Sequence, residues 1–253
     1  MLLPLLPAFE GDISSESGGI ALRTILHFNY SSICRGPQSI FRQLQMENIN
    51  PSNYISFCSL RQKGELLGSQ VTELVYIHSK LMIVDDKIVI CGSANINDRS
   101  LLGSRDSEMS VIIEDTEFEE GTMDGQKVEY GKFAGNLRLK LMQEHLGGID
   151  IDLKDCISDS FYKDVWLKIA SKNTKLFEET FLCLPTDEVK TMDDNKKYLL
   201  KRSLAHSDKF LALQKMKEVQ GYLVLLPLSY LEDTNLLPGK FVKEGMVPTR
   251  LWT

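Results

Sequence analysis

Residue types that can act in catalysis occur at fixed intervals in one short stretch of the chain. The stretch contains His78, Lys80 and Asp85, followed by GSAN at residues 92–95, and its pattern is H-x-K-x4-D-x6-G-S-x-N. If the first part forms a strand, His78 and Lys80 point to the same face, about 7 Å apart. A histidine that attacks or transfers a proton, beside a lysine that neutralises phosphate oxygens, suits an anionic substrate.

The residues that follow add groups to the same site. Gly92 permits close backbone approach, and Asn95 offers an amide donor to the same anion. Each residue alone has an ordinary structural interpretation, since a lone lysine is nearly always solvated and Asp85 beside Asp86 needs only to form a turn. The spacing of all six identities favours a functional site. The sequence holds no metal-ligand cluster, G-x-S-x-G elbow or Walker loop that competes with it.

Short strands are expected to carry these residues. Alternating or apolar runs predict strands at residues 54–60, 72–84 (bent midway), 87–91, 109–113 and 221–228, with a turn at 85–87. Helical spacing and stop signals predict two helices within residues 18–49, separated by a break at Gly36-Pro37, and further helices at 133–145, 159–170 (with Ser158 as N-cap) and 186–217. The acidic segment at residues 117–129 is expected to be a surface loop. This mixture of helices and buried strands predicts an α/β layered fold.

Composition limits the classes of protein that fit. The chain has 253 residues, of which 43% are hydrophobic and 25% charged, as in ordinary globular proteins. Its five cysteines are scattered and never form a CxxC pair, which indicates a reducing compartment. The net charge of −6 disfavours general attraction to nucleic acid. Prolines interrupt the short apolar start, so we expect any membrane contact to be peripheral.

The pattern around His78 resembles the HKD signature of the phospholipase D superfamily, and the likeness extends well beyond the motif. The segments that resemble the animal type of this family are GSANINDRS at 92–100, Gly103, RDSE at 105–108, LLP at 5–7, FEGD at 9–12, VP at 247–248 and WT at 252–253. The resemblance implies an α-β-α sandwich that is one half of a two-lobed catalytic unit. Residues 1–148 would form the second HKD lobe, and residues 149–253 a carboxy-terminal extension of helices and strands packed on that lobe.

The same resemblance implies roles for single residues. His78 would be the general acid that protonates the departing choline oxygen and later activates water or an alcohol. The histidine of the first motif would be the nucleophile and form a phosphohistidine intermediate. Glu108 would orient the His78 ring through its other nitrogen, with a carboxylate oxygen within about 3 Å of that ring.

Substrate binding and local structure are implied for the remaining residues. Lys80 and Asn95 would bind phosphate oxygens, with Ser93 close by. Asp85 would be structural and hold the turn and its neighbours. The family chemistry implies neither a metal ion nor an organic cofactor.

The activity implied for the family is hydrolysis of phosphatidylcholine to phosphatidic acid and choline, together with transfer of the phosphatidyl group to alcohols. The implied partners are a phospholipid membrane surface on the cytosolic side, small GTPases and phosphoinositides, and not nucleic acid. A complete site has two motifs, whereas this sequence has one, because His27, His145 and His206 are not followed two residues later by lysine. We therefore expect a fragment whose amino-terminal HKD half is a separate part of the enzyme.

Two other interpretations stay open at this point. A phosphodiesterase or nuclease with one motif per chain would complete its site as a symmetric homodimer, although the charge of −6 disfavours a nucleic-acid substrate. A truncated, non-catalytic product would keep the fold and act only as a binding module. The presence of His78, Lys80, Asn95 and Glu108 disfavours such decay.

Overall fold

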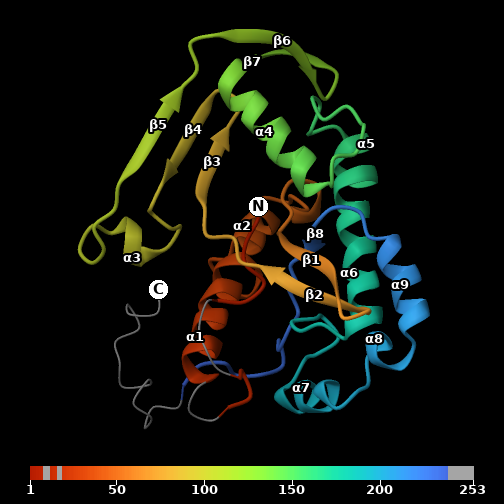
Figure 1. The fold of residues 1–253 in the computed structure, drawn as a ribbon. Coiled ribbons are helices and arrows are strands. Elements are labelled where there is room, and N and C mark those ends of the chain that lie inside the picture. The colour runs from red at the N-terminus through yellow and green to blue at the C-terminus, as the bar shows by residue number, and fades with distance from the viewer. Residues whose placement is uncertain (8–11, 16–18, 239–253) are drawn as a thin grey trace.

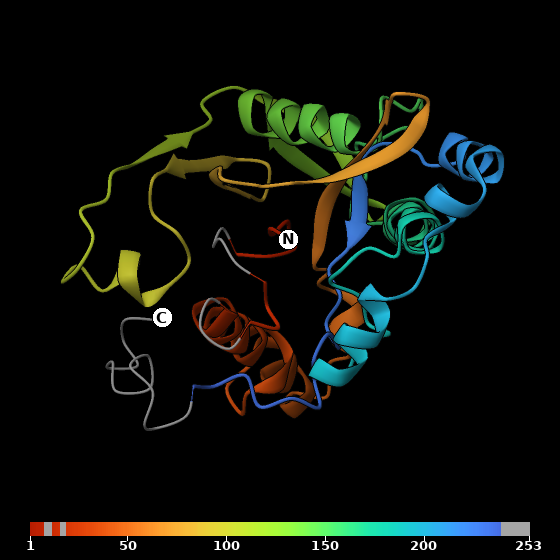
Figure 2. The same ribbon diagram turned by 60° about the horizontal axis from the view of Figure 1, so that its bottom comes forward.

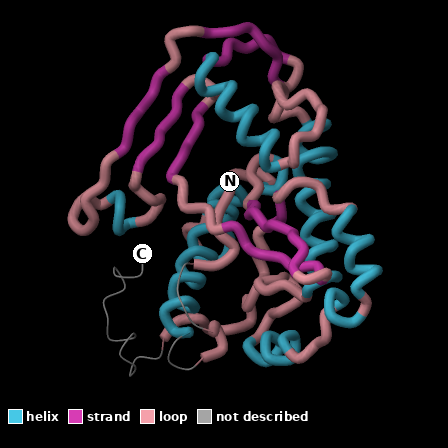
Figure 3. The backbone as a smooth tube through the Cα atoms, in the orientation of Figure 1, coloured by secondary structure: helices cyan, strands magenta, loops and turns pink. Residues whose placement is uncertain are grey.

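The computed structural model describes residues 1–7, 12–15 and 19–238. The expected α/β fold is confirmed, and the strands form three small antiparallel sheets (Figures 1 and 3). The strands are β1 Cys58–Leu66, β2 Ser69–Val75, β3 Lys80–Val84, β4 Ile88–Gly92, β5 Ser110–Glu114, β6 Phe118–Met123, β7 Gln126–Gly131 and β8 Leu223–Leu225. The segments FEG at residues 9–11, VP at 247–248 and WT at 252–253, which contribute to the family resemblance, lie outside the described residues.

The two helices expected within residues 18–49 and the helix expected at 133–145 are confirmed, and three further short helical segments were not predicted. The short helical segments and helices there are α1 Gly19–Tyr30, η1 Ser31–Arg35, α2 Ile40–Met46, η2 Pro51–Asn53, α3 Asp98–Leu101 and α4 Lys132–His145. The chain breaks between η1 and α2 at Gly36-Pro37, as expected, and Ser39 caps α2 by accepting a hydrogen bond from the Arg42 amide.

The helices of the second half are more divided than the sequence suggests. They are α5 Asp159–Phe161, η3 Tyr162–Leu167, α6 Lys168–Phe181, α7 Met192–Leu199, α8 Leu204–Ser207 and α9 Lys209–Lys217. Ser158 caps α5, as predicted from its position. The expected helix at 186–217 is three helices, because Thr191 and Asp208 each cap a new helix start.

The sheet β2-β1-β8 forms part of the main core. Strand β8 pairs with β1 over Cys58–Leu60, and helix α6 packs on β8. The Asn173 side chain of α6 donates to the Leu223 carbonyl at 2.9 Å, and the Thr174 hydroxyl accepts from the Leu225 amide at 2.8 Å. The start of the chain joins this sheet as well, since the Leu3 amide donates to the Cys58 carbonyl.

The sheet β3-β4-β5 lies on the opposite side of the molecule from α6 and α9 (Figures 1 and 2). Its strands are antiparallel, and Val89 is its one fully buried large apolar residue among the described positions. The strand expected at 72–84, with a bend midway, is two strands in two different sheets, since β2 ends at Val75 and β3 begins at Lys80. The residues between them, 76–79, are outside either strand.

The acidic segment at residues 117–129 is not a loop, and this expectation was wrong. Strands β6 and β7 form a hairpin whose turn is Asp124-Gly125, with φ of 49° and 73°. Asp-Gly is a strong signal for a turn in which both residues have positive φ. The acidic residues suggested a loop instead, although alternate residues of an exposed hairpin can also be charged.

None of the described helices is both long and apolar enough to cross a bilayer.

Candidate functional site

The motif residues gather at one end of the sheet β3-β4-β5. Lys80, the first residue of β3, pairs with Gly92 at the end of β4, and Gly92 pairs with Ser110 at the start of β5. Glu108 is two residues before Ser110, and Ser93 directly follows Gly92. The three strand ends therefore bring segments 78–80, 92–95 and 108–110 together.

His78 lies in the connection between β2 and β3 and is exposed. Lys80 is partly buried, and its ammonium group donates to the His78 carbonyl at 2.6 Å. The His78 ring is near that of Tyr76, with 6.1 Å between ring centroids. The expectation that His78 is a strand residue was wrong, because β3 begins at Lys80. The hydrogen bond from the Lys80 ammonium group to the His78 carbonyl nevertheless keeps the two residues close.

Glu108 is held by two serine hydroxyls from two different segments. Ser93 donates to one carboxylate oxygen at 2.6 Å, and Ser100 of α3 donates to the other at 2.6 Å. These hydrogen bonds, first that from Ser100 and then that from Ser93, lower the pKa of Glu108, and the charge of Lys80 lowers it further. The two serine hydroxyls therefore hold the Glu108 carboxylate at the motif end of the sheet.

The expected contact between Glu108 and His78 is absent from the described part of the chain. Both carboxylate oxygens are occupied by serine hydroxyls, and no hydrogen bond joins the carboxylate to the imidazole. The physical reason is that His78 precedes β3 rather than lying within it, so the register of the sheet does not direct its ring toward Glu108.

Ser100 is a site residue that the motif did not identify. It is buried, and its amide donates to the side chain of Asn97, the N-cap of the short helix α3. This cap turns the chain so that the hydroxyl faces Glu108. An Asn followed three residues later by a small polar residue is a helix-start signal that could have identified this turn.

Ser93 and Asn95 differ in how firmly they are held. The Ser93 hydroxyl also accepts a hydrogen bond from the Met109 amide at 3.0 Å, which joins the end of β4 to the start of β5. Asn95 is exposed, and its side chain forms no hydrogen bond with any described residue. Its amide is thus available to a ligand at this end of the sheet.

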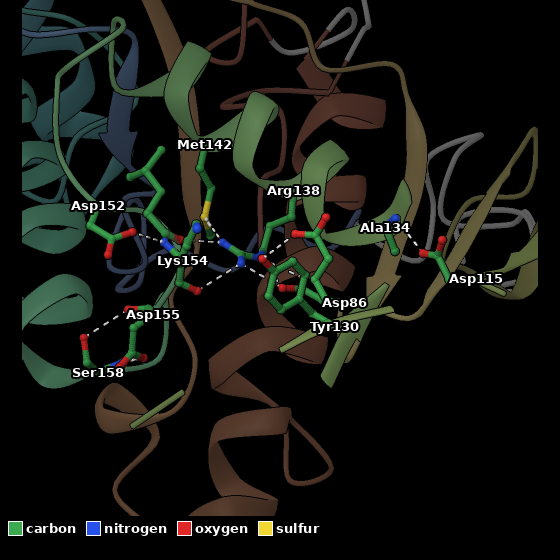
Figure 4. A network of polar contacts seen from close by, with 12 residues as sticks. Asp86, Asp115, Tyr130, Ala134, Arg138, Met142, Asp152, Lys154, Asp155 and Ser158 are labelled. Atoms are coloured by element: carbon green, nitrogen blue, oxygen red, sulfur yellow. Dashed lines mark hydrogen bonds and ion pairs between the residues drawn. The ribbon is translucent and has the colours of Figure 1, made fainter. Parts of the chain in front are cut away.

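The two adjacent aspartates of the turn have different environments. Asp85 is exposed, whereas Asp86 is buried and pairs with Arg138 of α4 (Figure 4). Both have φ of 52°, in the left-handed region that aspartate tolerates at such turns. The turn itself is confirmed, since the Lys87 amide donates to the Val84 carbonyl. The polar contacts that the sequence assigned to Asp85 belong to Asp86.

The arrangement suits binding of a phosphate group. A lysine, a free amide and a serine cluster at the end of the sheet, and an exposed imidazole lies next to them. Among the described residues, no group of three or more His, Cys, Asp or Glu side chains is arranged to hold a metal ion. All five cysteines lie in the described part, and none is in a disulfide.

Comparison with known proteins identifies the family. The family model described as phospholipase D matches residues 59–192, which include every site residue discussed above and more than half of the chain. The chain belongs to the phospholipase D family. The resemblance drawn from the motif and its flanking segments is therefore confirmed.

Individual relatives extend the match over the whole chain. Phospholipase D1 of Mus musculus is 48% identical over 257 residues, covering 100% of this chain and 24% of the relative. Phospholipase D2 of Bos taurus is 46% identical, with 100% and 27% covered. Phospholipase D zeta 1 of Arabidopsis thaliana is 39% identical over 265 residues, with 94% and 24% covered. The chain thus spans about a quarter of the length of the curated relatives it matches.

Proposed function

We propose that this chain supplies one half of the active site of a phospholipase D that hydrolyses phosphatidylcholine to phosphatidic acid and choline, and transfers the phosphatidyl group to alcohols. The observation that carries the proposal is the meeting of His78, Lys80, Ser93 and Glu108 at one end of a single sheet. Family membership supports it, since the relatives named above are phospholipases D.

The proposed reaction has two steps. In the first, a histidine of the other motif attacks phosphorus, a P–N bond forms, and the bond from phosphorus to the choline oxygen breaks as His78 protonates that oxygen. In the second, His78 takes a proton from water or an alcohol, whose oxygen attacks phosphorus and releases the histidine. Lys80 and Asn95, with Ser93 nearby, would bind the non-bridging oxygens.

Asp85 and Glu108 would act through the residues around them. Glu108, fixed by Ser93 and Ser100, would balance the charge of Lys80. It would also hold the two serine segments together at the phosphate-binding end of the sheet. Asp85 would complete the turn.

We propose that residues 1–148 form the HKD lobe and residues 149–253 an extension packed on it. Pairing of β8 with β1 supports the packing of the extension on the lobe.

The proposed partners are the amino-terminal HKD half and a phospholipid surface. Strand β5 supports the first, because all five of its residues are exposed and three of them, Val111, Ile112 and Ile113, are large and apolar. Such a face is commonly covered by another part of the protein or a partner. We further propose peripheral association with the cytosolic face of membranes, and regulation by small GTPases and phosphoinositides, on the basis of the family alone.

The test is to assay choline release from phosphatidylcholine vesicles by this chain alone, by the upstream half of a relative alone, and by the two together. We expect no appreciable release from either half and restored release from the mixture, because removing one member of an acid–nucleophile pair costs orders of magnitude in rate. Transfer to ethanol would report the same intermediate.

Other outcomes of this assay select the alternative functions. Robust release from the lone chain, together with a dimer in solution, would favour a homodimeric phosphodiesterase. If the lone chain cleaved neither lipid nor nucleic acid, and the upstream half restored nothing, a non-catalytic binding module would remain.

A further inference from the structure

The buried ion pair between Asp86 and Arg138 joins the sheet of the motif to the rest of the molecule (Figure 4). Side-chain exposure is 4% for Asp86 and 12% for Arg138. The Arg138 Nε donates to both carboxylate oxygens, at 2.8 and 2.9 Å, and its Nη2 donates to one of them at 2.7 Å. An ion pair with this geometry and burial holds its two segments in one orientation.

Arg138 also contacts a third segment. Its Nη1 donates to the Leu153 carbonyl at 2.8 Å, and its Nη2 to the Lys154 carbonyl at 3.1 Å. The guanidinium thus joins the β3–β4 turn, helix α4 and the segment that follows α4. Only a planar group with several fixed donors can make these contacts together, and a lysine cannot reproduce them.

Further contacts join α4 to the same end of the sheet. The Gly131 amide, just before α4, donates to the Asp86 carbonyl at 2.7 Å. Asp115, just after β5, accepts from the Phe133 and Ala134 amides at 2.9 and 2.7 Å and so caps the helix. A side chain at Gly131 would collide with the Asp115 carboxylate. Helix α4 therefore holds the sheet at the end opposite the motif residues.

The Asp86–Arg138 ion pair, here called the anchor, lies at one end of the sheet, and the motif residues lie at the other. The distance between these two ends determines how far a movement at the anchor displaces the motif. Strand β3 runs from Lys80 to Val84, a length of about 13 Å. A rotation of roughly 10° at the turn would therefore move Lys80 by about 2 Å. A displacement of about 1 Å at a reacting group can reduce a rate about a hundredfold.

We propose that Asp86 and Arg138 are positioning residues for His78 and Lys80, setting the orientation of the β3–β4 hairpin on helix α4 and hence the place of the motif at its other end. This inference rests on the proposed function for its kinetic consequence. Neither residue touches the reacting groups, and the effect passes through the hairpin.

The kinetic test uses the enzyme assembled from this chain and its upstream half, with a soluble short-chain phosphatidylcholine. Arg138→Lys and Asp86→Asn are expected to lower kcat about 10-fold to 100-fold while KM changes less than about 2-fold, because the anchor orients catalytic groups rather than binding substrate. Lys132→Gln is the matched control. Lys132 forms an exposed ion pair with Glu117 at the start of the same helix, and its loss is expected to leave kcat unchanged.

A purely structural role would give a different result. Each variant is assayed well below its own Tm, and rates are expressed per folded molecule from circular dichroism. If kcat is then that of the wild type although the Tm falls, the proposal is wrong. Should Asp86→Asn fail to fold, the double variant Asp86→Leu/Arg138→Met removes both charges, a change that buried pairs often tolerate. It is expected to fold and to retain the loss in kcat.

Nuclear magnetic resonance of this chain alone separates this inference from the proposed function. Arg138→Lys is expected to shift the backbone amide signals of Lys80, Gly92 and Ser110, whereas Lys132→Gln is expected to leave them in place. If the wild-type assembly does not cleave the lipid, the proposed function fails and these shifts decide the inference. Unmoved signals at all three positions would overturn it.

Discussion

The two larger sheets of this chain differ in how they are covered. In the sheet β2-β1-β8, strand β8 lies under helix α6, and Leu223 is completely buried. In the sheet β3-β4-β5, the outer strand β5 is exposed along its whole length, and Ile112 is 63% exposed. The first sheet holds the molecule together, whereas the second carries the motif and leaves it open at one end.

This difference explains how one short chain can have both a stable core and an accessible site. The second sheet is held by α4 at its turn, through Asp86 and Asp115, and presents Lys80 and Ser93 at the other end. Functional groups placed on a strand end keep their geometry without being buried. Substitutions in the two sheets are therefore expected to affect different properties.

The largest effect is expected from His78→Asn in the assembled enzyme. Turnover is expected to fall at least about a thousandfold, because no other described histidine lies in the segments at the strand ends. Choline release gives the rate, and circular dichroism gives the fold. As His78 is exposed, the Tm of the chain is expected to be unchanged.

A variant that lost its activity together with its fold would not support this role. Substitution of the exposed His206, which lies far from the motif in sequence, is the matched control and is expected to retain full turnover. Retention of substantial activity in His78→Asn would remove His78 from the proposed mechanism.

Truncation of one buried side chain in the first sheet and one exposed side chain in the second tests directly whether the two sheets contribute differently to stability. Leu223→Ala is expected to lower the free energy of unfolding by about 2 to 5 kcal/mol, because it leaves a cavity in the core. Ile112→Ala is expected to change it by less than about 0.5 kcal/mol, because the side chain is largely exposed.

Urea unfolding of the isolated chain, followed by circular dichroism, measures both values. A large loss of stability in Ile112→Ala would mean that β5 is covered in solution, for instance by a second copy of the chain. A concentration-dependent midpoint would distinguish that case from a covered monomer.

Glu108→Gln is expected to have a smaller effect, confined to activity. Glutamine can still accept a hydrogen bond from one serine, so the free energy of unfolding is expected to stay close to that of the wild type. The loss of negative charge beside Lys80 is expected to lower kcat about tenfold. A loss of a thousandfold or more would restore a direct role for this carboxylate in catalysis.

Ser100→Ala provides a second measurement on the same residue. The hydrogen bond from Ser100 is the first cause of the lowered pKa of Glu108, so its removal is expected to raise that pKa toward its ordinary range. Carbon-detected titration of the Glu108 carboxylate checks this. An unchanged pKa would mean that the two serines do not hold the carboxylate in solution.

The sequence predicted those elements whose signals are local. Ser158 identified a helix start, Gly36-Pro37 a helix break, and the Asp85-Asp86 pair a turn, because each acts through its own backbone geometry. The hairpin at 118–131 was missed because its charges resemble those of a loop, although Asp124-Gly125 was a local signal for it.

Site contacts between distant segments could not be predicted in the same way. The motif identified His78 and Lys80, but strand alternation did not reveal that the chain leaves one sheet and enters another between Val75 and Lys80. The partner of Asp86 is 52 residues away in sequence, and nothing in the motif points to Arg138. Such pairs depend on tertiary packing, which local pattern does not encode.

The smallest effect concerns the pH dependence of the free energy of unfolding, to which the half-buried His145 is expected to contribute. Its ring is near Trp166, with 6.4 Å between centroids, and its Nδ1 is buried without a hydrogen-bond partner among the described residues. Burial lowers the pKa of His145, and the nearby Glu144 opposes this only in part. The protonated ring is thus disfavoured in the folded chain.

The sign of the pH dependence follows from this direction. Because the folded-state pKa is below the unfolded value of about 6.5, the unfolded chain binds the proton first as pH falls. The contribution of His145 to stability is therefore complete above about pH 6.5 and is lost as pH falls toward the folded pKa, with a slope of at most about 1.4 kcal/mol per pH unit. His145→Gln removes this titration, so the difference in unfolding free energy between wild type and variant is expected to shift in favour of the variant between pH 7.5 and pH 5.5. Urea unfolding at both values measures the shift. A difference that moved in favour of the wild type would mean that the folded chain stabilises the protonated ring. The His145 ring would then be less buried in solution than its packing indicates.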